Sequence, residues 1–257
     1  MRSYFRKWMP RYFSNILWGA RERWGLEAVK DDPCWIEWQK TYEIFYSANQ
    51  REGFGTKVND GGYKVMKSID LSGKTVLEIG AGDVRHLKYI NGMPKEYIIA
   101  DNLESMMNLA KNKLKKNSIP HRSVLVKSNQ ALPIEDASID VIVSFYSLEH
   151  LHPLENYLED MYRALKPGGM LVGAIPTEGG FAWGLGRVLT SRRWIKRNTS
   201  IDYDKIICWE HPNFADYLIS QMDKLFVRKS TKFWPFSKLP LLDINLILSF
   251  KYIKPKD

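Results

Sequence analysis

The chain has 257 residues and a mass of 30.0 kDa, with 44% hydrophobic and 26% charged residues. This composition excludes a disordered tail and a low-complexity repeat, and the length favours one sizeable domain with a modest insertion. The two cysteines, Cys34 and Cys208, lie far apart, and no His or Cys pair has a second pair at zinc-site spacing. A disulfide framework and a structural zinc site are therefore poorly supported, and we expect no metal and a reducing compartment.

No apolar segment of the sequence is suited to crossing a membrane. A transmembrane helix needs about 20 apolar residues, and the best candidate, residues 239–253, is interrupted by proline and by polar side chains. The first 20 residues lack a compact apolar stretch, so we expect no signal peptide. The sequence predicts a cytoplasmic protein, with peripheral contact at the inner face of the membrane left open.

The positive charge is concentrated at the two ends of the chain. The formal charge is +9 overall, but residues 1–30 carry +5, residues 31–179 carry −3 and residues 180–257 carry +7. Basic flanks are typical of proteins that meet a nucleic acid, an anionic lipid surface or an anionic substrate. Composition alone does not separate these three classes of partner.

The first 62 residues are predicted to form a helical extension rich in aromatic side chains. Between Tyr4 and Trp24, apolar residues recur at three- and four-residue steps, and Pro10 predicts a kink or two short helices. Such a stripe indicates either an interfacial helix on lipid or, slightly favoured, a helix packed against the domain. Residues 35–48 form a second predicted helix, and residues 49–62, with four glycines, are predicted to be a loop.

Short apolar runs then alternate with helical patterns. Strands are predicted at 75–79, 97–100, 124–126, 139–145 and 170–175, and helices at 84–90, 104–115 and 154–165. This alternation predicts a doubly wound α/β fold, a Rossmann-like parallel sheet with helices on both faces and a ligand crevice at the carboxyl ends of the strands.

The regular alternation ends after Ile175. Residues 176–211 contain four glycines and a cationic run, and they predict a lid or an insertion that faces a substrate. A helix at 212–224 and two strands at 225–230 and 244–253 are predicted to close the sheet as an antiparallel pair. The expected organisation is thus an extension over 1–62 and a seven-stranded domain over 63–257 that carries the insertion.

A glycine turn and an acidic residue mark the predicted ligand crevice. The first strand leads into Gly80-Ala81-Gly82, where the backbone turns sharply and a Cβ would obstruct a ligand. Asp101 ends the next predicted strand, about 20 residues further on, where a carboxylate accepts hydrogen bonds from the hydroxyls of a ribose. Arg85 stands where the full glycine pattern of a dinucleotide site needs its third glycine, which weakens a nicotinamide-dependent oxidoreductase as an alternative.

With these motifs in order, residues 74–175 resemble the class I S-adenosylmethionine-dependent methyltransferases. The segments that carry the resemblance are 76–82, 101–110, 131–143, 147–151 and 165–171. The resemblance implies S-adenosylmethionine as cofactor and cofactor contacts from Glu78, Gly80, Ala81, Gly82, Asp101, Asn102, Ser128, Asn129, Gln130 and Ser144. The chain departs from the family pattern in having Val84 at a frequent glycine position, and Ser128-Asn129-Gln130 where an acid often binds the adenine.

Methyl transfer needs an aligned nucleophile and, for an alcohol, a base that takes its proton. Candidates for that base are His211, His150 and Glu178, and Glu149 and Glu210 are less favoured candidates. A lone histidine is more often structural than catalytic, and His150 lies in a segment that resembles common scaffold of the family. His211 is favoured because it follows the insertion, where a lid would meet the crevice.

The acceptor is inferred from the second half of the chain. Aromatic and cationic residues share the segments 176–183 and 190–197, and Glu210-His211-Pro212-Asn213-Phe214 is similar to segments of glycan-pathway methyltransferases. We expect O-methylation of a sugar in a polysaccharide or lipid-linked glycan. The alternatives are a small-molecule or quinone methyltransferase, an RNA methyltransferase, and a non-catalytic regulatory protein that binds the cofactor. No RNA-binding module is recognisable, so nucleic acid is not the expected partner, and the oligomeric state stays open.

Overall fold

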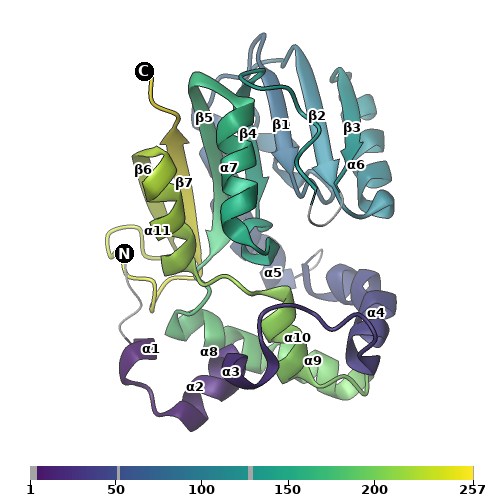
Figure 1. The fold of residues 1–257 in the computed structure, drawn as a ribbon, viewed down its shortest axis with the longest axis vertical. Helices are drawn as coiled ribbons and strands as arrows, with labels where there is room; N and C mark the ends of the chain where they lie inside the picture. Colours follow the sequence, from purple (N-terminus) through teal and green to yellow (C-terminus); the bar gives the residue numbers. More distant parts are fainter. Residues whose placement is uncertain (1–4, 51–52, 127–129, 257) are drawn as a thin grey trace.

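One seven-stranded sheet organises the molecule. The computed structural model describes residues 5–50, 53–126 and 130–256 (Figure 1). The strand order is β3-β2-β1-β4-β5-β7-β6, with β1 to β5 parallel and β7 antiparallel to both β5 and β6. The predicted doubly wound α/β fold, with an antiparallel pair at one side, is confirmed. The strands are β1 Thr75–Ile79, β2 Glu96–Asp101, β3 His121–Leu125, β4 Ile139–Phe145, β5 Leu165–Pro176, β6 Val227–Trp234 and β7 Ile247–Ile253.

The two faces of the sheet bury two separate cores. Alternate residues of a strand point to opposite faces, so Leu77 and Ile79 of β1 join the core beneath α7 (Leu154–Ala164) and α11 (Ala215–Leu225). Val76 joins the other core, beneath α5 (Gly53–Tyr63), η1 (Lys64–Ser68) and α6 (Glu104–Lys116). Helices on both faces explain why these strands are apolar at nearly every position rather than at every second one.

A layer of helices lies along the carboxyl edge of the parallel strands, below the sheet in Figure 1. It joins the amino-terminal extension to the insertion after β5, and its shared core includes Trp38, Ile195, Ile206 and Trp209. The indole nitrogen of the buried Trp18 donates to the Gly180 carbonyl oxygen at 3.2 Å. The helices of this layer are α1 Phe5–Trp8, α2 Arg11–Trp18, α3 Arg21–Trp24, α4 Pro33–Gln50, α8 Phe181–Leu189, α9 Ser191–Asn198 and α10 Tyr203–Glu210.

The amino-terminal residues form short helices. The break between α1 and α2 falls at Pro10, which confirms the two short helices. Apart from the residues outside the described ranges, no helix combines the length and apolar character that spanning a bilayer requires.

The predicted loop over residues 49–62 is wrong, because α5 occupies Gly53–Tyr63. Two of its glycines permit helix-to-sheet contacts that a side chain would block. A Cβ on Gly61 would lie 2.8 Å from the Trp234 ring, and one on Gly62 would lie 2.5 Å from the Ala174 Cβ. Tertiary packing thus outweighs the poor helix propensity of glycine here.

Smaller differences concern the ends of elements. The helix predicted at 84–90 is the short 3₁₀ helix η2 (Arg85–Tyr89), and the third strand covers residues 121–125 rather than 124–126. A third short 3₁₀ helix, η3 (Leu148–His150), follows β4 and brings two polar side chains to the carboxyl edge.

Val84 closes the turn after β1 in a left-handed conformation, with φ 45° and ψ 46°. This conformation is costly for a β-branched residue. The side chain is nevertheless 2% exposed and packs in the core beneath α5 and α6. Packing therefore stabilises a backbone that the residue itself disfavours.

We predict that Val84→Gly is more stable than Val84→Ala by about 1 kcal/mol, because both lose the packing but only glycine relieves the left-handed strain. Urea unfolding of the two variants measures the difference. Val76, buried in β1, is the control, and there alanine is expected to be the more stable replacement by about 0.5–1 kcal/mol. If Val84→Ala is at least as stable to urea as Val84→Gly, the proposed backbone strain at residue 84 is contradicted.

Candidate functional site

The turn after β1 and the end of β2 lie together at the carboxyl edge of the sheet, where the sequence predicts a ligand crevice. Gly80 and Gly82 have φ values of 67° and 52°. A Cβ on Gly80 would lie 2.4 Å from the Ser147 Cβ, so glycine is required where η3 passes the turn. The carboxylate of Asp101 accepts from the Gly82 N–H at 3.2 Å and from the Leu103 N–H at 2.9 Å.

Asp101 has the properties of a ribose ligand. The two carboxylate oxygens together offer four lone pairs, and the backbone N–H groups of Leu103, Gly82 and Asn102 use three of them. Burial raises the pKa of this carboxyl, while these three backbone donors and the charge of His150 oppose the rise. The residues present therefore fit a nucleoside cofactor, because Asp101 keeps acceptor capacity for a hydroxyl beside the glycine turn.

Glu78 lies beneath the turn rather than in the crevice. Its side chain is 1% exposed, accepts a hydrogen bond from the Tyr97 hydroxyl at 2.8 Å, and lies 3.4 Å from Nδ1 of His86. His86 Nε2 and the Tyr97 hydroxyl are 2.9 Å apart. Burial raises the pKa of Glu78 well above its ordinary value despite the Tyr97 hydrogen bond. These contacts give Glu78 a positioning role beneath the predicted cofactor turn.

The other predicted cofactor residues are distributed unevenly. Ala81 is buried in the turn, and Asn102 and Gln130 are exposed beyond β2 and before β4. Ser128 and Asn129 lie outside the described residues. Ser144 is fully buried, and its hydroxyl lies 2.6 Å from that of Ser147, which donates to the Ile79 carbonyl oxygen at 2.8 Å. Ser144 thus helps to join the ends of β4 and β1.

Two predicted histidines meet at the carboxyl edge beside Glu149. The rings of His150 and His211 have centroids 4.6 Å apart. One potential ligand atom from each of the two histidines and Glu149 lies within 4.8 Å of the others. Burial raises the pKa of Glu149 to about 7 against the opposing charge of His150. Burial lowers the pKa of His211 to about 4, although Glu178 favours the protonated ring.

Glu178, the third predicted catalytic residue, lies next to Nδ1 of His211. One carboxylate oxygen lies 2.8 Å from Arg187 Nη2, and the other accepts from Arg187 Nη1 and from Trp183 Nε1, each at 2.9 Å. His211 Nδ1 lies 3.2 Å from this second oxygen. Burial alone would raise the pKa of Glu178, but the charges of Arg187, His211 and Arg21 outweigh it and lower the value to about 2.

Arg187 and Asn213 are parts of the site that sequence reasoning did not single out. Arg187 begins the cationic run of the insertion, yet it is 7% exposed, whereas Arg193 and Arg197 in the same run are exposed. The side-chain amide of Asn213 donates to the carbonyl oxygens of Leu148 and Leu151, at 3.1 and 2.5 Å. The sequence signal that could have indicated the burial of Arg187 is its position, because it is the first arginine of the run and lies at the end of an apolar helix.

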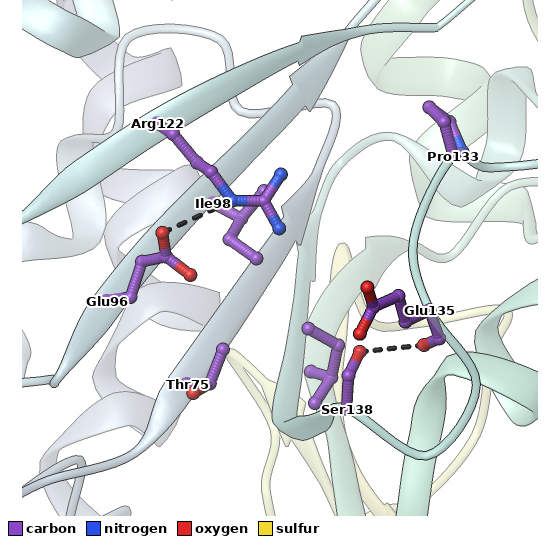
Figure 2. A pocket seen from close by; sticks show the side chains of 8 residues that line it. Thr75, Glu96, Ile98, Arg122, Pro133, Glu135 and Ser138 are labelled. Carbon is purple, nitrogen blue, oxygen red and sulfur yellow. Dashed lines mark hydrogen bonds and ion pairs between the residues drawn. The ribbon is translucent and has the colours of Figure 1, made fainter.

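A hollow on the opposite edge of the sheet is not part of this site. Figure 2 shows its lining from the amino-terminal ends of the strands, including Thr75, Glu96 and Arg122. Arg122 pairs with Glu96 at 3.2 Å, so its charge is compensated. Ligands of open α/β sheets bind at the carboxyl ends of the strands, where the glycine turn, Asp101 and the two histidines lie.

Comparison with known proteins agrees with this placement. Residues 77–173 match a family model described as a methyltransferase domain. The matched segment begins in β1 and ends in β5, and it includes the glycine turn, Asp101 and η3. Residues 77–173, less than half of the chain, are therefore similar to methyltransferase domains. The class I fold and the cofactor predicted from the sequence, S-adenosylmethionine, are confirmed for this domain.

The curated relatives of the methyltransferase domain include quinone-modifying enzymes. The chain is 31% identical over 144 residues to the ubiquinone/menaquinone biosynthesis C-methyltransferase of Vibrio campbellii, covering 52% of this chain and 56% of the relative. It is 34% identical over 113 residues to the demethylmenaquinone methyltransferase of Lactococcus lactis, covering 42% and 45%. The chain thus matches about half the length of these relatives.

A solved methyltransferase shares the fold over most of the chain. The structure of an S-adenosylmethionine-dependent methyltransferase from Aquifex aeolicus superposes with a TM-score of 0.56 at 16% identity. The match covers 82% of this chain and 97% of the other. At this identity the likeness describes the architecture, and the chemistry has to be argued from the site.

We predict that Asp101→Asn weakens S-adenosylmethionine binding about 10- to 150-fold, because a charge-assisted hydrogen bond contributes about 1.5–3 kcal/mol. Isothermal titration calorimetry of the intact chain measures the change. Asp140→Asn, at the start of β4 on the other edge of the sheet, is the matched control and should bind as the unaltered chain does. Equal affinity of the Asp101 variant and the unaltered chain would remove Asp101 from the cofactor site.

Proposed function

We propose that this protein transfers a methyl group from S-adenosylmethionine to a small lipophilic acceptor of the phenol or quinol class. The observation that carries the proposal is the meeting of Glu149, His150 and His211 at the edge that holds Asp101 and the glycine turn. A polar cluster next to a cofactor site is suited to orient a hydroxyl-bearing acceptor. The similarity to quinone methyltransferases supports the acceptor class.

One group of residues would bind the cofactor, and a second group would bind the acceptor. S-adenosylmethionine, when bound, supplies an electrophilic methyl group on a sulfonium. Gly80, Gly82 and Asp101 would hold its methionine and ribose parts. The cluster of Glu149, His150 and His211 would position the acceptor's hydroxyl and assist removal of its proton, which precedes attack from the oxygen or from a ring carbon conjugated with it. The helical layer along this edge would exclude water.

The structure offers less support for the sugar acceptor expected from the sequence. That expectation depended on the basic flanks, on the aromatic amino-terminal residues and on the segment from Glu210 to Phe214, and in this segment Asn213 and Phe214 make structural contacts. Asn213 holds two carbonyl oxygens of the η3 region. The Phe214 ring lies under the guanidinium groups of Arg6 and Arg21, at 3.9 and 3.7 Å from its centroid. These contacts account for the segment without a glycan, so we favour the quinol alternative.

We expect the purified chain to methylate a demethylated quinol or a substituted phenol when given S-adenosylmethionine with a radiolabelled methyl group. His211→Ala should lower the rate at least about 100-fold, in the range that positioned proton-transfer groups contribute, while it keeps cofactor affinity. His152→Ala, an exposed histidine two residues beyond His150, should retain the activity of the unaltered chain. Label that enters only polysaccharide, glycolipid or RNA would contradict the phenol or quinol acceptor.

A lipophilic acceptor also suggests where the protein works. We propose that α1 and α2 contact an anionic membrane surface. Trp8, Tyr12 and Phe13 are 85%, 72% and 54% exposed on these helices, and the exposed cations Lys7 and Arg11 lie beside them. Aromatic rings at the lipid boundary with cations at the headgroups are typical of interfacial helices.

Sedimentation with phosphatidylglycerol vesicles tests this contact. The unaltered chain should co-sediment with these vesicles and much less with phosphatidylcholine vesicles, because each cation near an anionic surface contributes about 1 kcal/mol. Replacement of both Trp8 and Tyr12 by alanine should reduce the bound fraction several-fold. Met93→Ala, at an exposed apolar residue before β2 (53% exposed), is the control. Binding unchanged in the double variant would exclude α1 and α2 as the contact.

A further inference from the structure

Glu149, His150 and His211 have the composition and spacing of a metal site. Their three potential ligand atoms lie within 4.8 Å of one another. A tetrahedral ion with bonds of about 2.0–2.1 Å would bring such atoms to about 3.4 Å. Binding of an ion would therefore draw these atoms together by at most about 1.4 Å.

The Nδ1 atom of each histidine lies next to an acceptor oxygen, which leaves Nε2 for an ion. Nδ1 of His150 is hydrogen-bonded to the Glu210 carbonyl oxygen, and its Nε2 faces the Glu149 carboxylate at 4.0 Å. Nδ1 of His211 lies 3.2 Å from Glu178. Metal-binding histidines characteristically contact a backbone carbonyl or a carboxylate through their second nitrogen, which orients the ring. Both kinds of support occur here.

The buried carboxylate of Glu149 supports a cation site independently of the spacing of the three side chains. Its side chain is 2% exposed, and its Oε2 has no hydrogen-bond partner among the described residues. A buried carboxylate oxygen without a donor is costly. A cation at this point would satisfy it.

The support behind His211 is rigid. Glu178 is fully buried and fixed by both terminal nitrogens of Arg187 and by the Trp183 indole. It can therefore orient the His211 ring without competing as a ligand. Two imidazoles and one carboxylate suit zinc and neighbouring divalent transition ions better than Mg²⁺ or Ca²⁺, which prefer oxygen ligands alone.

We propose that Glu149, His150 and His211 bind one divalent transition-metal ion of the zinc class, with an open coordination position for the acceptor's hydroxyl oxygen. This assignment of the acceptor rests on the proposed methyl transfer. On binding, the hydroxyl forms a bond to the ion through oxygen and gives its proton to solvent water, so the acceptor enters the reaction as an oxyanion. The carboxylates of Glu149 and Glu178 offset the positive charge of the ion near the cofactor.

Metal content and affinity of the purified chain test the site itself. After removal of metals with a chelator, titration with Zn²⁺ should show one ion per chain. Co²⁺ in its place should give visible absorption bands of a site with nitrogen ligands. His150→Ala and His211→Ala should each weaken Zn²⁺ binding at least about 100-fold, beyond the 10- to 100-fold cost of losing a supporting group. His152→Ala should bind as tightly as the unaltered chain.

Thermal melting distinguishes a lost ligand from a lost fold. Saturating Zn²⁺ should raise the Tm of the unaltered chain and of the His152 variant, but not the Tm of the His150 or His211 variant, which should still melt cooperatively. Failure of the unaltered chain to bind Zn²⁺ or Co²⁺, or equal affinity in all variants, overturns the metal site.

Methyl transfer by the same preparations separates the two proposals. If the ion binds as described and no phenol or quinol is methylated, the metal site stands and the proposed function fails. If the metal-free chain methylates a quinol at the full rate, the proposed function stands and the ion's role at the acceptor oxygen is overturned. Transfer that is lost on chelation and restored by Zn²⁺ supports both.

Discussion

The carboxylate of Asp101 holds the edge on which the site is built. It joins the glycine turn after β1 to the chain after β2 through two backbone N–H groups. The Gly80 N–H donates in turn to the Ala100 carbonyl oxygen at 2.8 Å. The turn is thereby fixed to the neighbouring strand, next to the carboxylate that is predicted to bind the ribose. Because η3 passes within contact of Gly80, the same turn also places the polar cluster.

The helical layer supplies side chains that hold the residues of the site in place. Arg21, from the amino-terminal extension, donates to the carbonyl oxygens of His211 and Pro212. Arg187, from the insertion, donates to the Leu17 carbonyl oxygen and pairs with Glu178. Segments about 170 residues apart in the sequence thus hold His211 from two sides. Loss of either arginine would leave buried polar groups without partners, which is far more costly than loss of an exposed ion pair.

The sheet and the cofactor edge could be predicted from the sequence because local signals specify them. Apolar runs mark the buried strands, the glycine turn follows the first, and Asp101 ends the second. His150 and His211 were predicted separately, and the structure brings them together through the contact of Asn213 with η3. Their pairing with Glu149 depends on tertiary packing, which no spacing in the sequence encodes.

Other features could not be predicted because long-range packing opposes local preference. The helix α5 forms despite its glycines, since those glycines permit contact with Trp234 and Ala174. Val84 adopts a left-handed backbone because its side chain is buried. Arg187 belongs to a cationic run in which Arg193, Lys196 and Arg197 are exposed, and only the fold shows that Arg187 compensates the buried Glu178. Each case is decided by residues distant in the sequence.

The central claim is that cofactor and acceptor meet between Asp101 and the Glu149, His150 and His211 cluster. A crystal structure of the complex with S-adenosylhomocysteine tests it most directly. We expect the ribose hydroxyls on the Asp101 carboxylate and the sulfur directed toward the two histidines. A nucleoside bound at the opposite edge, near Thr75 and Arg122, or a sulfur directed away from the cluster, would contradict the account.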